Sequence, residues 1–198
     1  RIGIRYLTET DLDFEDDPQT SWRDPIGKAL GDPTVPLDLG VTMPQAVNIG
    51  VHHQWDEKLN LLGSVGWDEI SAFGRIQVEI DGNGTPGTTL NEDFRDVWNF
   101  GVGAEYQWQS DLQIVGGVSM DTNMSSTRTR SLAIPLGALY RYSIGFKQKR
   151  DEGTFGGGLT WLYEGNLPIE DKAGIGGEVN GKYSNVSLYI FSFYWTWN

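Results

Sequence analysis

Apolar and polar residues alternate one by one along much of the chain, which is the pattern of β-strands with two different faces. From Trp98 to Trp108 every second residue is apolar, and the residues between them are glycine, asparagine, glutamate or glutamine. Similar stretches recur along the sequence, with a break near residues 70–74 that indicates a bulge or bend. Together they predict about eight antiparallel strands, at residues 1–14, 45–55, 59–80, 98–108, 112–120, 138–147, 155–163 and 186–198.

The last of these stretches has the most one-sided pattern. From Tyr189 onward its odd-numbered residues are all aromatic, namely Tyr189, Phe191, Phe193, Trp195 and Trp197. Such a row would be a poor water-exposed face, but it suits a strand whose outer neighbour is lipid, with tryptophans at the membrane edge. We therefore expect this stretch to be the closing strand of a transmembrane β-barrel.

The predicted connections alternate strictly between long and short. Short turns follow the second, fourth and sixth strands, and a Gly-rich loop at 164–184 precedes the last strand. Transmembrane barrels have short periplasmic turns and long extracellular loops, so residues 15–43 are expected to form a long extracellular loop and both chain ends to lie on the periplasmic side. The predicted fold class is an all-β, antiparallel, up-and-down transmembrane β-barrel, either complete in residues 1–198 or part of a larger barrel.

A soluble β-sandwich remains an alternative, because its strands also alternate, with the apolar face turned inward. Two features favour the membrane barrel: aromatic residues recur at strand ends, and the presumed inner face holds mostly glycine, serine, asparagine, glutamine and charged residues. No apolar run is long enough for a transmembrane helix, but barrel strands need only about 9–11 residues.

Composition narrows the classes further. The chain has 26 glycines and 8 tryptophans, which suits a two-faced barrel. It has no cysteine, which excludes disulfides and thiolate metal sites. Its net charge of −12 argues against a nucleic-acid partner. The sequence begins without Met or a signal peptide, so we expect a processed chain or a fragment.

Six short sequence runs follow one another along the chain and can be compared with known families. They are RIGIRY at 1–6, MPQAVNIG at 43–50, GWDEISAF at 66–73, DVWNFGVGAEY at 96–106, YRYSIGF at 140–146 and GKYSN at 181–185. In this order and spacing they resemble the C-terminal half of the FadL family, the outer-membrane transporters of long-chain fatty acids and aromatic hydrocarbons in Gram-negative bacteria. Two positions depart from the family pattern. Ile70 stands where a second Trp is usual, and Asn198 follows Trp197 where the family usually ends on an aromatic residue.

The resemblance implies passive uptake of a hydrophobic small molecule (a fatty acid, a detergent or an aromatic hydrocarbon) through a barrel in the bacterial outer membrane. The family has about fourteen strands and an N-terminal hatch inside the barrel, so we expect this chain to be the C-terminal part of a transporter or a shortened relative. We expect contact with outer-membrane lipid, a monomer, no cofactor and no enzyme activity. A small structural or adhesive barrel, or a soluble β-sandwich binding module, is the alternative.

Extended extracellular loops form a hydrophobic groove in the family, and by position residues 15–43 would be one of them. Residues 21–31 could hold a short helix, and the loop is rich in apolar residues for an exposed segment. These side chains would either capture the ligand or pack on one another to fold the loop: Trp22, Ile26, Leu30, Val35, Leu37 and Leu39.

The predicted inner face also carries charged and polar residues. They would form a structural ion network, or one of the basic residues would meet a fatty-acid carboxylate during passage. The candidates are Arg5, His52, Arg95, Glu105 and Arg141. Neighbouring His52 and His53 point to opposite faces of a regular strand and cannot share a metal ion, so no metal site is expected. The acidic run between Asp11 and Asp17 is either a solvated loop or a calcium site without regular ligand spacing.

Overall fold

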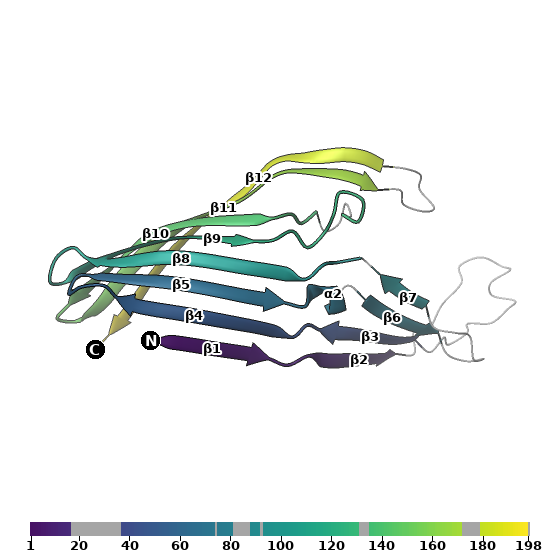
Figure 1. Ribbon diagram of the computed structural model, residues 1–198, viewed down its shortest axis with the longest axis horizontal. Helices are drawn as coiled ribbons and strands as arrows, with labels where there is room; N and C mark the ends of the chain where they lie inside the picture. Colours follow the sequence, from purple (N-terminus) through teal and green to yellow (C-terminus); the bar gives the residue numbers. More distant parts are fainter. Residues whose placement is uncertain are drawn as a thin grey trace, which may run out of the picture.

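The chain is almost entirely β-structure in the ranges that the computed structural model describes (Figure 1), which are residues 1–16, 37–73, 75–80, 88–91, 93–130, 135–171 and 179–197. Twelve strands and one helix of four residues lie in these ranges. No helix among the described residues is long and apolar enough to cross a membrane. The predicted helix at 21–31 lies outside these ranges.

Eight strands form one antiparallel sheet whose order follows the sequence. They are β1 (Ile2–Leu7), β4 (Ala46–Gln54), β5 (Leu59–Asp68), β8 (Val97–Gln107), β9 (Leu112–Asp121), β10 (Leu139–Arg150), β11 (Gly153–Asp171) and β12 (Val179–Trp197). This arrangement confirms the predicted all-β, up-and-down topology. Among the described strands, β1 and β12 are the two edges and do not pair with each other. The sheet is therefore an open wall, and β12 does not close a barrel onto β1.

A second sheet continues the first four strands of the wall. It contains β2 (Thr10–Asp16), β3 (Leu37–Met43), β6 (Arg75–Ile80) and β7 (Thr88–Asn91), in that order. Figure 1 shows each of them extending one strand of the larger sheet on the side away from the chain ends. The segment expected to be one strand to residue 14 is thus two strands, and the last seven residues of the predicted loop 15–43 form β3.

The first four strands of the wall are separated from their extensions in the second sheet at the same level. We call this line of breaks the crease between the two sheets. Pro44 lies between β3 and β4 and has no N–H for the ladder. At the third break, α2 (Ile70–Phe73) occupies the place of the predicted bulge. The Ser71 hydroxyl donates to Asp96 Oδ1 over 2.7 Å, and Gln45 Nε2 donates to Glu69 Oε2 over 2.7 Å. These side-chain bonds add to the remaining backbone bonds, such as Glu69 N to the Gln45 carbonyl oxygen at 3.0 Å, and hold the crease together.

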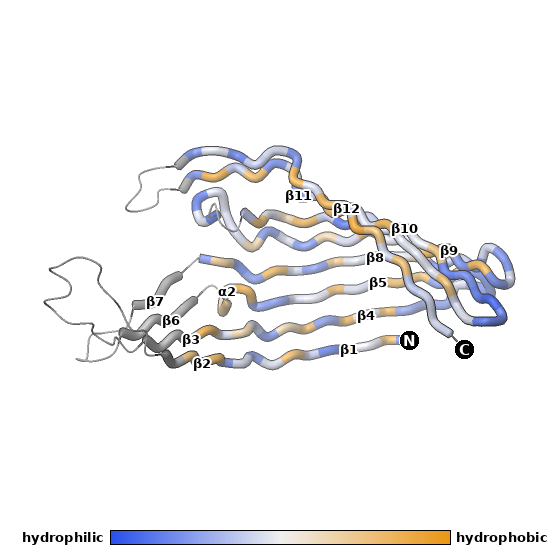
Figure 2. The backbone as a smooth tube through the Cα atoms, turned by 180° about the vertical axis from the view of Figure 1, so that it is seen from behind, coloured by the Kyte–Doolittle hydropathy of each residue, from blue (hydrophilic) through white to orange (hydrophobic). Residues whose placement is uncertain are grey.

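The register of the wall confirms the two faces expected from the sequence. One continuous row crosses all eight strands and contains Ile2, Val51, Gly63, Val102, Val118, Tyr142, Trp161 and Tyr189. The neighbouring row, on the opposite face, contains Gly3, Gly50, Ser64, Gly101, Ser119, Arg141, Leu162 and Leu188. Figure 2 shows the resulting alternation of hydrophobic and hydrophilic positions along the strands.

The wall curves towards its polar face. Leu62 on β5 and Tyr194 on β12 line the same hollow, although four strands separate β5 from β12 in the sheet. Glycines on this face allow the curvature: a Cβ on Gly145 would lie 2.8 Å from the carbonyl oxygen of Gly157, and one on Gly117 would lie 3.0 Å from that of Val102. The polar face is therefore concave and corresponds to the inside of a barrel.

The connection after β9 packs against the far end of β11. Arg130 is only 4% exposed, and its guanidinium donates to the carbonyl oxygens of Leu136 (3.0 Å) and Pro168 (2.7 Å). Burial lowers the pKa of Arg130, and nearby Glu164 acts in the opposite direction. Leu167 and Ile169 are buried close by. Residues 164–171 and 179–184, which were expected to be loop, thus extend β11 and β12.

Candidate functional site

The convex face of the wall is the lipid-facing surface. Its side chains are large, apolar and exposed, including Phe191 at 69% and Phe193 at 72%. Near the two ends of β8, Trp98 and Trp108 mark the two edges of the apolar band of this face. They are ten residues apart. Ten residues span about 34 Å along a strand. At a tilt of about 40° this gives about 26 Å, close to the height of the apolar band of an outer-membrane barrel.

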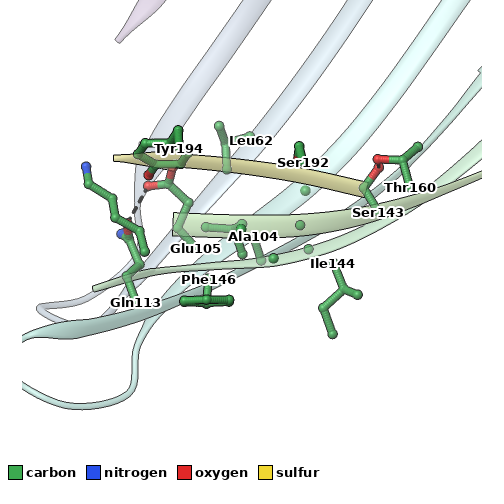
Figure 3. Close-up of a pocket in the computed structure, with 17 residues that line it drawn as sticks. Leu62, Ala104, Glu105, Gln113, Ser143, Ile144, Phe146, Thr160, Ser192 and Tyr194 are labelled. Carbon is green, nitrogen blue, oxygen red and sulfur yellow. Dashed lines mark hydrogen bonds between the residues drawn. The ribbon is translucent and has the colours of Figure 1, made fainter. Parts of the chain in front are cut away.

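The concave face contains a hollow of about 510 Å³, drawn in Figure 3. Its floor is the backbone of the inner-face glycines Gly103, Gly145 and Gly158, together with the side chain of Val115, which is next to Gly145. In the close-up Glu105 and Tyr194 extend to one side of the strands, whereas Ile144 and Phe146 point to the opposite side. The rim is formed by Leu62, Glu105, Gln113, Ser143, Lys147, Thr160, Ser192 and Tyr194.

Most polar groups around this hollow bond to one another. The Glu105 carboxylate accepts from Asn60 Nδ2 at 3.3 Å and from Gln113 Nε2 at 3.5 Å. The hydroxyls of Ser143 and Thr160 are 2.9 Å apart. Because these groups already have partners, an apolar molecule that passes over them displaces few hydrogen bonds to water.

Nearer the long connections, a second polar belt crosses the same face. Arg141 donates to Asp121 through its two terminal guanidinium nitrogens, Nη1 and Nη2, with Nη1 to Oδ1 at 2.8 Å. Asn99 Nδ2 donates to Asp68 Oδ2 over 3.0 Å. The Arg141 and Asp121 side chains are 35% and 21% exposed, so the pair is only partly shielded from solvent. This geometry supports a structural ion network for Arg141, one of the two roles considered for it.

The five predicted inner-face candidates do not meet in one site. Glu105 lines the hollow, whereas Arg141 is bound to Asp121 outside it. His52 lines a separate hollow beside β1. The Arg5 side chain is exposed and makes no hydrogen bond or ion pair to another described residue. Arg95 precedes β8 and therefore lies outside the strands of the wall.

The six residues expected to capture a ligand are placed only in part. Trp22, Ile26, Leu30 and Val35 lie outside the described residues. Leu37 and Leu39 belong to β3, where they pair with Ile80 and Val78 of β6. The capture role of these residues stays a prediction from the sequence.

Sequence reasoning missed several residues of the concave face. Asp121 was assigned to a loop, yet it ends β9 and pairs across the sheet with Asn99 and Leu139. Gln113, Ser192 and Tyr194 were not selected, although each falls on the inner face by simple alternation. The alternation does not reveal the curvature of the sheet, and this curvature brings β5 and β12 to the same hollow.

The features of this site are the shape of its concave surface and the polar groups on that surface. Among the residues described, no group of three or more His, Asp or Glu side chains is placed to hold a metal ion. The concave face joins a smooth glycine floor to internally paired polar groups, and the convex face is apolar. A wall of this kind can separate a polar interior from lipid and can line a path for molecules.

Comparisons with known proteins agree with this geometry. A family model described as "Outer membrane protein transport protein (OMPP1/FadL/TodX)" matches residues 1–194. The long-chain fatty acid transport protein of Escherichia coli O6:H1 is 23% identical over 144 residues, which are 68% of this chain and 32% of that protein. The chain thus spans about a third of the length of this relative.

Solved structures show the same fold. A crystal structure of a Pseudomonas aeruginosa FadL homologue has a TM-score of 0.70 at 21% identity, covering 80% of this chain and 36% of that one. The crystal structure of the P. putida toluene transporter TodX has a TM-score of 0.54 at 15% identity, covering 97% of this chain and 44% of that one. The eight-stranded wall is therefore equivalent to part of a larger transmembrane barrel.

These matches confirm the resemblance seen in the sequence. They also confirm the bacterial outer membrane as the location and transport, not enzymatic catalysis, as the activity of the family. The family match extends over nearly the whole sequence. The chain belongs to the outer membrane protein transport protein family, OMPP1/FadL/TodX.

Proposed function

We propose that this chain forms part of the wall of a channel that admits hydrophobic small molecules through the outer membrane by passive diffusion. The substrate class is long-chain fatty acids or aromatic hydrocarbons. Similarity to a long-chain fatty acid transport protein and to a toluene transporter supports these classes. The observation that carries the proposal is the glycine-floored hollow on the concave face.

The hollow suits the passage of an apolar molecule for a physical reason. Where Gly103, Gly145 and Gly158 form the wall, no side chain extends inward. An apolar molecule can lie against the backbone there without separating a polar side chain from its partner, because Glu105 and Ser143 already hydrogen-bond to neighbours. Passage of this kind needs no covalent chemistry.

A fatty acid would also bring a carboxylate, which needs a cationic or hydrogen-bonding partner in the channel. Arg141 is engaged by Asp121, so it offers little free positive charge. The Arg5 side chain is exposed on the concave face of β1 and makes no polar contact to another described residue. Among the predicted basic candidates on the wall, Arg5 is therefore the one that we propose for transient contact with the carboxylate.

The test is to obstruct the hollow in the full-length protein. Ser143→Trp places a large ring in the hollow, whereas Ile144→Trp places the same ring on the convex face at the next residue, where Ile144 is 62% exposed. Uptake of radiolabelled oleate and of radiolabelled toluene is measured separately in cells with equal amounts of folded protein. We expect Ser143→Trp to slow uptake about tenfold, as a barrier raised by about 1.4 kcal/mol does.

Ile144→Trp should transport at the rate of the unmodified protein. Equal uptake by both variants would show that the hollow does not lie on the path. Comparison of the oleate and toluene rates identifies the substrate class. An Arg5→Gln variant that slows oleate uptake but not toluene uptake would support the carboxylate contact, and equal effects on both would contradict it.

A further inference from the structure

The convex face is not uniformly covered by large side chains, and it contains two hollows. A hollow of about 690 Å³ lies above Ala104 and Gly116. These two are the smallest residues in the row that crosses the wall at this level. Leu61 bounds it on one side, and Ile144 and Leu159 bound it on the other. A second hollow of about 350 Å³ lies above Gly157 and shares Ile144 and Leu159 with the first. The two hollows are neighbours on the lipid-facing surface, both bounded by Ile144 and Leu159, and together they are called the groove.

Aromatic rings form the end of this groove that lies towards the long connections. The rings of Tyr142 and Trp161 line the larger hollow and are stacked with centroids 5.3 Å apart; Tyr189 stands beside Trp161, outside the lining, and is nearly parallel to it at 6.2 Å. Tyr142 and Tyr189 are 44% and 58% exposed, and their hydroxyls make no hydrogen bond to another described residue. The groove therefore has a polar, aromatic end and an apolar body.

We infer that the Tyr142 hydroxyl lies below the edge of the apolar band. Tyr142 is in the same row as Val102, which is four residues closer to the membrane centre than Trp98. A hydroxyl at this depth has little water to bind, so leaving it without a partner costs free energy. An amphiphile whose ester or headgroup oxygens reach this level would supply the acceptors.

We propose that the groove is a binding site for one membrane lipid, with an acyl chain over Gly116 and its polar end at Tyr142 and Tyr189. The position of the groove within the apolar band selects this occupant, because acyl chains fill that layer of the membrane. Between apolar surfaces in a membrane the attraction comes from close packing, and a chain that fills the hollow gains contacts that a flat surface cannot give. Hydrogen bonds from the two tyrosines orient the lipid.

The inference predicts a specific effect of filling the groove. A Cβ on Gly116 would lie 3.5 Å from its nearest neighbour, the carbonyl oxygen of Ser143, which is ordinary van der Waals contact. Gly116→Leu therefore occupies the groove without forcing the backbone to move. Gly63→Leu is the matched control, because Gly63 is on the same face, has open space around it and lies outside the groove.

The experiment uses full-length protein in phosphatidylethanolamine and phosphatidylglycerol vesicles that contain a phosphatidylethanolamine with a diazirine on one acyl chain. After illumination, labelled peptides are mapped by mass spectrometry. We expect labelling concentrated at Ile144 and Leu159, and we expect it to fall about tenfold in Gly116→Leu, equivalent to about 1.4 kcal/mol of binding. Gly63→Leu should retain it, and resistance to heat in detergent verifies that both variants are folded.

Several outcomes would overturn the proposal. Labelling spread evenly over the convex face, or equal labelling in the two leucine variants, would show ordinary lipid contact without a site. Crosslinks between two copies of the protein at the groove, in place of lipid labels, would show that a second protomer covers it. Replacement of both Tyr142 and Tyr189 by Phe should lower the labelling; unchanged labelling would contradict the contact with the polar end of the lipid.

Discussion

The ring of Tyr194 lies over Gly156 on the concave face, where the two residues are directly opposite each other on β12 and β11. The three atoms nearest to the Cβ position of Gly156 all belong to the ring and hydroxyl of Tyr194. The aromatic ring thus covers a glycine that would otherwise leave the backbone bare, and it is held at the rim of the hollow.

Gly156→Ala should displace the Tyr194 ring from this position, because the new methyl group takes the space of the ring. We expect a loss of about 1–2 kcal/mol in the free energy of unfolding. Tyr194→Ala alone should also destabilise, whereas the double variant should lose less than the sum of the two. Urea unfolding in detergent measures all three. The control is Gly50→Ala, since Gly50 has open space around it on the same face; an equal loss there would contradict the explanation.

Asp121→Ala should leave the Arg141 guanidinium without its carboxylate. Because both side chains are partly exposed, the coupling between them should be about 1 kcal/mol, lower than for a fully buried pair. A double-mutant cycle with Arg141→Met, measured by unfolding in detergent, gives this value. Arg141→Lys should restore only part of the stability, since lysine keeps the charge but not the two parallel hydrogen bonds. Additive effects in the cycle would show that the two residues act independently.

The sequence was sufficient to assign the faces of the strands because alternation with a period of two depends only on local residue order. The aromatic row from Tyr189 to Trp197 was correctly placed on the lipid side, and Trp98 to Trp108 followed the same rule. Curvature could not be inferred in this way, because it depends on how closely the backbones of neighbouring strands approach each other, as at Gly145 and Gly157, and the alternation within one strand does not report that distance.

The boundaries of the strands were less predictable for a related reason. Asp121 is polar and next to a polar segment, so it was assigned to a loop. It nevertheless belongs to β9, since its carboxylate meets Arg141 across the sheet. The crease between the two sheets was also missed, because it depends on bonds such as Ser71 to Asp96, which join separate breaks in the chain.

Arg130→Met should loosen the connection between β9 and β10. The substitution removes the donors for the Leu136 and Pro168 carbonyl oxygens, and each buried carbonyl left without a partner costs about 1–3 kcal/mol. Hydrogen exchange of residues 122–130 should increase while that of β9 stays unchanged. Arg128→Met is the control, because Arg128 is nearby but exposed. The same increase in both variants would exclude a special role for Arg130.

Replacement of Trp22, Ile26 and Leu30 by Ser tests the capture hypothesis for the segment at 15–43. If these side chains hold the ligand, the affinity of the full-length protein for a fatty acid should decrease, because the apolar contact area is lost. Equilibrium binding of a fluorescent fatty acid measures this change. Unchanged affinity would favour the alternative that these residues only pack on one another.

The bare glycine floor has a kinetic consequence. A surface with few projecting groups offers a sliding molecule no deep energy minimum, so the molecule leaves each position about as easily as it reaches it. Strong binding at any one point would improve occupancy but would slow release, as in every conducting pore. On this concave face the backbone that allows the sheet to bend around Gly145 and Gly158 also keeps the friction on a passing molecule low.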